Sequence, residues 1–246
     1  TEMYFGLPYN ETLNYVVFFG TITGYNFVKY YGIAKFHHRS LTNNLKIIQL
    51  FSLVCFALLF YFGMQLSLKT LLLYTLFGFL TILYAIPFLS GFQKSLRAFS
   101  YMKVIVVVFV WAGVTVLLPV FDAGQITINS ELLLTFLQRF LIVIVLILPF
   151  DIRDLQFDTI SLQTVPQKIG VKNTKKLGYV LMLGALFLEF ILAPNANFRN
   201  VFLVFFFSVI FLLMRSKTNQ SKYYSSFLVE ALPIFWCVLL FGILNF

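Results

Sequence analysis

Charged residues are scarce in this chain. Of its 246 residues only 11% are Asp, Glu, Lys or Arg, whereas about a quarter of an average soluble domain is charged. An ordinary water-soluble fold is therefore excluded. Cysteine is scarce too: Cys55 and Cys237 lie in apolar runs without partners at metal-ligand spacing, which excludes a disulfide scaffold and predicts two small core residues. No short-period repeat or low-complexity linker is visible, so disordered and repeat architectures are excluded as well.

Hydrophobic residues make up 60% of the chain, and the mean hydropathy is +0.90. A helix of roughly 20 apolar residues crosses a bilayer once, and the apolar runs are continuous rather than alternating, which favours helices over a β-barrel. The expected spans are the eight segments 13–33, 47–64, 68–89, 101–121, 131–150, 177–194, 200–214 and 227–246. We therefore expect an all-α, polytopic transmembrane helical bundle, with one membrane domain over residues 1–246.

Basic residues alternate between the connections of these spans. In or beside the first, third, fifth and seventh connections lie 15 of the 18 Lys and Arg residues. The positive-inside rule then places 32–46, 90–103, 151–176 and 215–226 in the cytoplasm and both chain ends outside. The net charge of +9 follows from cytoplasmic loops that face anionic lipid, and it does not indicate nucleic-acid binding.

Acidic side chains gather just past the fifth expected span. Residues 149–170 read PFDIRDLQFDTISLQTVPQKIG and contain Asp151, Asp154 and Asp158. On a helix this spacing puts the three carboxylates within about 60° of one face, because each residue turns by about 100°. Carboxylate oxygens are hard ligands that suit Mg²⁺ shared with substrate phosphates. The competing interpretation is a solvated face that Arg153 and the downstream lysines neutralise.

This stretch resembles the second aspartate-rich motif of the UbiA-type intramembrane prenyltransferases. DIRDLQFD matches its Asp-x-x-Asp-x-x-x-Asp core, and TVPQKIG matches its Thr-x-Pro…Gly tail. YAIP at 84–87 is similar to the family's segment at the cytoplasmic end of an earlier helix. The resemblance covers nearly the whole chain and implies a nine-helix membrane fold in a bacterial inner membrane. Because the chain starts at Thr1 with eight spans, we expect its N-terminal first helix to be missing.

The resemblance implies a function and a set of site residues. The family passes a prenyl group from a polyprenyl diphosphate to a lipophilic acceptor, often an aromatic quinone precursor, and uses Mg²⁺. Asp151, Asp154 and Asp158 would be the catalytic residues and metal ligands, and Lys168 would contact the diphosphate.

The family's first aspartate-rich motif is largely lost in this chain. It should lie in GYNFVKYYGIAKFHHR at the end of the first span, where Asn26 aligns with the motif's Asn. The three acidic positions are occupied by Phe27, Tyr30 and Ala34. A site with two carboxylate clusters therefore cannot form in the usual way.

Two explanations of this loss stay open. In the first, Lys29, Lys35 and Arg39, beside Asn26, replace metal ions as the positive charge that faces the diphosphate. In the second, the protein is a catalytically silent lipid-binding or partner-binding member of the fold.

Other ionisable residues carry weaker signals. His37 and His38 are adjacent, so on a helix they diverge by about 100° and cannot hold one metal together. Glu189 and Glu230 lie in or near apolar spans, where ionisable groups are costly and are candidates for function; Glu230 is close enough to an expected end to reach the interface. A small-solute transporter is disfavoured, because it would place polar residues at the bilayer midplane, whereas the polar chemistry here clusters at one cytoplasmic rim.

Overall fold

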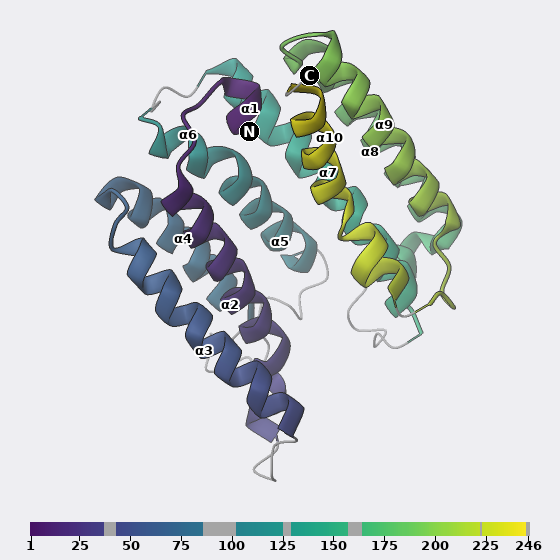
Figure 1. Ribbon diagram of the computed structural model, residues 1–246. Coiled ribbons are helices and arrows are strands. Elements are labelled where there is room, and N and C mark those ends of the chain that lie inside the picture. The colour runs from purple at the N-terminus through teal and green to yellow at the C-terminus, as the bar shows by residue number, and fades with distance from the viewer. Residues whose placement is uncertain (37–42, 86–101, 125–128, 157–163, 222, 245–246) are drawn as a thin grey trace. The chain divides into compact units, whose positions relative to one another are not determined.

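The computed structural model describes residues 1–36, 43–85, 102–124, 129–156, 164–221 and 223–244, and over these ranges the chain contains helices and no β-strand (Figure 1). The α-helices are α1 (Glu2–Phe5), α2 (Glu11–Phe36), α3 (Asn43–Gly63), α4 (Leu68–Ala85), α5 (Met102–Ala112), α6 (Leu118–Asp122), α7 (Ser130–Asp154), α8 (Val165–Leu192), α9 (Ala196–Arg215) and α10 (Leu232–Leu244). The π-helical segments Gly113–Leu117 and Tyr224–Val229 lead into α6 and α10. The expected all-α transmembrane bundle is confirmed.

As far as its residues are described, each of the eight expected spans overlaps a long helix or a run of consecutive helical segments. Within the described ranges, five segments are long and apolar enough to cross a membrane: Lys46–Gly63, Val104–Asp122, Ser130–Asp154, Ala196–Arg215 and Tyr224–Ile243. Leu68–Leu83 is a shorter apolar helix. The orientation of these segments across the membrane stays a prediction.

The helices form two compact units. The first comprises Thr1–Arg97 and Gly113–Thr127; within it α2 packs along α3 and α4, and α4 packs on α6. Asp122, the last residue of α6, accepts hydrogen bonds from Asn10 Nδ2 at 2.7 Å and from Thr70 Oγ1 at 2.9 Å. Its carboxylate therefore joins the starts of α2 and α4 to the end of α6.

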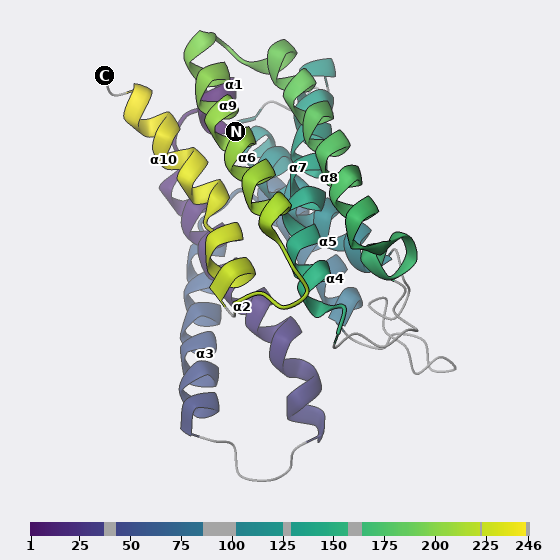
Figure 2. The same cartoon turned by 90° about the vertical axis from the view of Figure 1, so that its right-hand side faces the viewer.

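The second unit comprises Ala98–Ala112 and Ile128–Phe246. Here α7 packs on α5, α8 and α9, and α9 packs on α10 (Figure 2). Buried residues recur along α7 at intervals of three and four, the spacing of one helix face: Leu132, Thr135, Gln138, Ile142, Val145, Leu148 and Ile152. The single domain over residues 1–246 stays a prediction.

The outer faces of the second unit are apolar. Phe187 is 67% exposed and Ile234 is 67% exposed, as expected for side chains that face lipid. The same property corrects one expectation: Cys55 is buried as predicted, but Cys237 is exposed. Lipid tails are as apolar as a protein core, so a cysteine in an apolar run has no preference for the interior of the bundle.

Candidate functional site

The C-terminal end of α7 positions two of the three predicted carboxylates. Asp151 is 2% exposed, so α7 directs it into the unit and not into a solvated loop. Asp154, one helical turn later, forms an ion pair with Arg153: Nε lies 2.7 Å from Oδ1, and Nη2 lies 3.2 Å from Oδ2. The guanidinium of Arg153 also lies 5.3 Å from the ring centroid of Phe150. Asp158 lies outside the described residues.

Asp154 fits the interpretation of a solvated face, and Asp151 does not. A bidentate guanidinium contact already neutralises Asp154, as the solvated-face interpretation expects. Asp151 does not fit that interpretation, because its side chain is buried and does not lie on a solvated face. A carboxylate of this kind at the end of a membrane helix is a candidate for function.

Pro149 helps to hold this end of α7 in place. Proline has no N–H and disturbs the backbone hydrogen bonding of a helix, and here the carbonyl of Pro149 accepts hydrogen bonds from Gln220 Nε2 at 3.1 Å and Ser225 Oγ at 3.3 Å. Gln156 Nε2 donates to the carbonyl of Thr218 at 3.2 Å. The segment that follows α9 therefore braces the acidic end of α7 on both sides of Asp151.

The Thr-x-Pro…Gly tail of the motif forms the start of α8. Thr164 is the N-cap, and its N–H donates to Gln167 Oε1 at 3.0 Å, which is one half of a capping box. Gly170 then interrupts the helix with φ 75° and ψ 159°, a conformation open essentially to glycine alone. Lys168 lies between the cap and this break and is exposed. The motif therefore builds a short turn that presents Lys168 before the main part of α8 begins.

The residues of the degenerate first motif lie in the other unit, on α2. Asn26 donates from Nδ2 to Ser52 Oγ at 2.7 Å and so links α2 to α3. Lys29 is exposed, with Nζ 5.5 Å from the ring centroid of Tyr25. Lys35 lies within α2, while Arg39 is outside the described part of the chain. These residues belong to the first unit, whereas Asp151, Asp154 and Lys168 belong to the second.

The described residues fit Mg²⁺ in the type of their ligands. Over the described ranges no group of three or more His, Cys, Asp or Glu side chains is arranged to hold a metal ion. Mg²⁺ does not require such a group, because it is commonly held by one or two carboxylates together with substrate phosphates and water. Asp151 and Asp154 supply carboxylates of the right type, provided that Asp154 exchanges its contact with Arg153.

A second polar group, inside the bundle, was only partly predicted from the sequence. Glu189 on α8 is 1% exposed and accepts a hydrogen bond at 2.7 Å from Nε2 of Gln138 on α7, which is 0% exposed. Gln138 Oε1 accepts from Arg139 Nη1 at 2.5 Å. The Arg139 guanidinium lies 4.2 Å from the ring centroid of Trp236 on α10. Glu189 was a candidate from the sequence, but its partners were not.

One sequence signal pointed to those partners. Gln138 falls on the three-and-four spacing that otherwise selects apolar residues along α7, and Arg139 follows it. A polar residue on an apolar stripe indicates a buried hydrogen-bonded group.

Comparisons with known proteins place the fold. No family model matches the chain, and no curated protein matches its sequence. Among solved structures it is similar to a digeranylgeranylglyceryl phosphate synthase of membranes, with a TM-score of 0.55 and 16% sequence identity over 94% of this chain and 82% of the other. That synthase is a UbiA-type prenyltransferase. This chain therefore shares the helical fold of that synthase.

Proposed function

We propose that this chain is a UbiA-like membrane prenyltransferase, which transfers a prenyl group from a polyprenyl diphosphate to an aromatic or other lipophilic acceptor. The observation that carries the proposal is the buried Asp151 at the end of α7, followed by Asp154 and by the capped, glycine-broken start of α8. The shared fold supports it. We further propose a bacterial inner membrane as its location.

The reaction requires the bond between the allylic carbon and the diphosphate oxygen to break. The acceptor forms the new bond to that carbon and loses a proton, and the diphosphate leaves as an anion. Mg²⁺, when bound, supplies positive charge that stabilises this leaving group. Asp151 and Asp154 would hold the ion, together with Asp158 by resemblance.

In the second unit, Lys168 and Arg153 would contact the diphosphate. Lys168 is exposed and separated from the body of α8 by Gly170. The guanidinium of Arg153 now binds the carboxylate of Asp154. A phosphate group would replace this carboxylate, because guanidinium binds phosphate and carboxylate in the same bidentate manner. By resemblance alone, Asn26, Lys29, Lys35 and Arg39 would be further diphosphate contacts.

Calorimetric titration of the purified protein with geranylgeranyl diphosphate, with and without Mg²⁺, tests this proposal. We expect Mg²⁺ to strengthen binding, and we expect the double variant Asp154→Asn, Asp158→Asn to lose at least tenfold in affinity, which corresponds to about 1.4 kcal/mol. Glu131→Gln is the matched control, because Glu131 is exposed at the opposite end of α7. Binding without a Mg²⁺ effect and with unchanged affinity in the double variant would contradict the proposal.

A catalytically silent lipid-binding or partner-binding protein is the second candidate. The ion pair between Arg153 and Asp154 favours it, since it satisfies one carboxylate without metal. The absence of acidic residues between Glu11 and Asp122 favours it too. Transfer assays distinguish the candidates: the silent protein would release no diphosphate from the donor, with or without Mg²⁺ and an acceptor.

A further inference from the structure

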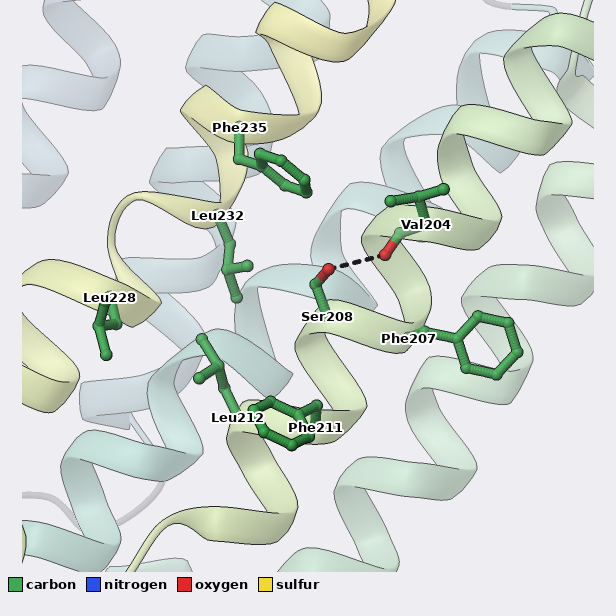
Figure 3. Close-up of a pocket in the computed structure, with 8 residues that line it drawn as sticks. All are labelled: Val204, Phe207, Ser208, Phe211, Leu212, Leu228, Leu232 and Phe235. Atoms are coloured by element: carbon green, nitrogen blue, oxygen red, sulfur yellow. Dashed lines mark hydrogen bonds between the residues drawn. The ribbon is translucent and has the colours of Figure 1, made fainter.

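An open apolar groove of about 580 Å³ lies on the second unit, between α9 and the C-terminal helical segments (Figure 3). It is lined by Val204, Phe207, Ser208, Phe211, Leu212, Leu228, Leu232 and Phe235. Ser208 is the polar member of this set, and its hydroxyl donates to the carbonyl of Val204 at 2.8 Å. The groove therefore offers an occupant almost only hydrocarbon.

Positive charge gathers where α9 ends. Arg215, the last residue of α9, lies with its guanidinium carbon 5.6 Å from the ring centroid of Phe211, which lines the groove. Lys175 on α8 reaches the same end, where Nζ donates to the carbonyl of Met214 at 2.8 Å. Burial, and then the nearby charge of Lys217, lower the pKa of Lys175 below its ordinary value. Lys175, Arg215 and Lys217 thus form a cationic cluster that a bound anion would stabilise.

We infer that the groove and the cationic cluster together bind one anionic phospholipid. An acyl chain would lie along α9 in the groove, and the phosphate would lie among Arg215, Lys217 and Lys175. We choose this occupant for its charge complementarity, because the apolar groove begins beside the cations that would bind the headgroup. The cluster also falls in the connection predicted to be cytoplasmic, where the leaflet is rich in anionic lipid. This inference is independent of prenyl transfer.

Native mass spectrometry of the detergent-purified chain tests the headgroup contact, with dioleoyl phosphatidylglycerol and dioleoyl phosphatidylcholine added separately. We expect tight binding of one phosphatidylglycerol. Each lost cation should weaken it about fivefold, so the double variant Arg215→Gln, Lys217→Gln should bind about 25-fold more weakly. The matched control, Lys46→Gln with Lys69→Gln, removes two exposed cations of the first unit and should change nothing. Equal loss in the control, or equal binding of phosphatidylcholine, would overturn the inference.

A second pair of variants tests the acyl chain. Val204→Trp places a large side chain in the groove, and Val180→Trp makes the same change on an exposed face of α8, where Val180 is 64% exposed. We expect Val204→Trp alone to weaken dioleoyl phosphatidylglycerol at least fivefold, with little effect on a dihexanoyl analogue whose chains are too short to fill the groove. Unchanged binding of the long-chain lipid would overturn the inference. Displacement of the lipid by equimolar geranylgeranyl diphosphate would also overturn it, since the groove would then belong to the prenyl donor.

Discussion

The side-chain amide of Gln138 on α7 donates a hydrogen bond to the carboxylate of Glu189 on α8 at 2.7 Å. The same amide also donates to the carbonyl of Ala185 at 3.2 Å, and its oxygen accepts from Arg139. Opposite charges on two helices are thus linked through one neutral side chain. In an apolar surrounding, hydrogen bonds of this kind help to compensate the cost of burying both charges.

Substituting Gln138 should destabilise the second unit. Gln138→Leu removes the donor that faces the buried Glu189, which costs about 1–3 kcal/mol, and each kcal/mol lowers the unfolding temperature by about 2–4 °C for a chain of this length. Thermal unfolding in detergent measures the effect. Gln49→Leu, on an exposed position of α3, is the matched control and should be nearly neutral.

A double-mutant cycle with Glu189→Leu separates this bond from general packing. We expect a coupling energy of about 1 kcal/mol between the two positions, in the range found for hydrogen bonds between membrane helices. Additive effects of the two substitutions would show that the bond contributes nothing measurable.

Replacement of the lost first motif by cations makes a separate prediction. If Lys29, Lys35 and Arg39 face the diphosphate, the triple change to Gln should weaken prenyl-diphosphate binding by well over tenfold, since each charge-assisted contact contributes about 1.5–3 kcal/mol. A triple change at the exposed Lys46, Lys172 and Lys176 is the control. Equal affinity in both triple variants would mean that Lys29, Lys35 and Arg39 only fix the orientation of the chain in the membrane.

The converse substitutions restore the acidic pattern. Phe27→Asp, Tyr30→Asp and Ala34→Asp rebuild the first motif. A gain of Mg²⁺-dependent prenyl transfer by this variant, while the native chain transfers to no acceptor, would favour the silent protein.

Any side chain at position 170 should destabilise the fold, because of the backbone conformation there. A Cβ at this position would meet no atom within 4 Å, so the cost of Gly170→Ala comes only from the positive φ of 75° and should be about 1–3 kcal/mol. Gly184→Ala is the matched control, because its Cβ would make an ordinary contact of 3.5 Å with Leu141 within a helix. Thermal unfolding should show a loss at 170 and none at 184; equal melting of the two variants would contradict the role assigned to Gly170.

The lowered pKa of Lys175 predicts how stability depends on pH. The unfolded chain holds this proton up to about the ordinary value of 10.5, whereas the folded chain releases it earlier. Between the two pKa values the unfolded state binds more protons, so stability should rise with pH. As the pH rises toward that ordinary value of 10.5, in neutral detergent without lipid, the native chain should gain stability relative to Lys175→Gln. Parallel pH curves for the two proteins would refute this.

Labelling of single cysteines tests the predicted orientation. In a background with Cys55 and Cys237 replaced by Ala, cysteines at Asn43 and Asn219 should resist an impermeant reagent applied from outside, because both positions fall in basic connections. Labelling at either position in intact cells would show that the predicted orientation is wrong.

The positions of the membrane helices could be read from the sequence, because the length of an apolar run is a local property. Asn129 and Asn195 accept backbone hydrogen bonds at the starts of α7 and α9, and the expected spans begin within a few residues of these caps. The location of the aspartate motif at the end of α7 was likewise readable, since a charged run must follow an apolar one to leave the bilayer.

The sequence by itself therefore determined where the chain is helical, which segments are apolar and where the carboxylates lie along it. Tertiary structure decided which side chains are buried and which meet across helices: Asp151 is buried, and Gln138 turns toward Glu189. It also left Cys237 exposed. The physical reason is that these outcomes depend on the rotation of each helix about its axis. In a chain apolar on nearly every face, lipid and protein attract a side chain almost equally, so only the packing of neighbouring helices selects that rotation.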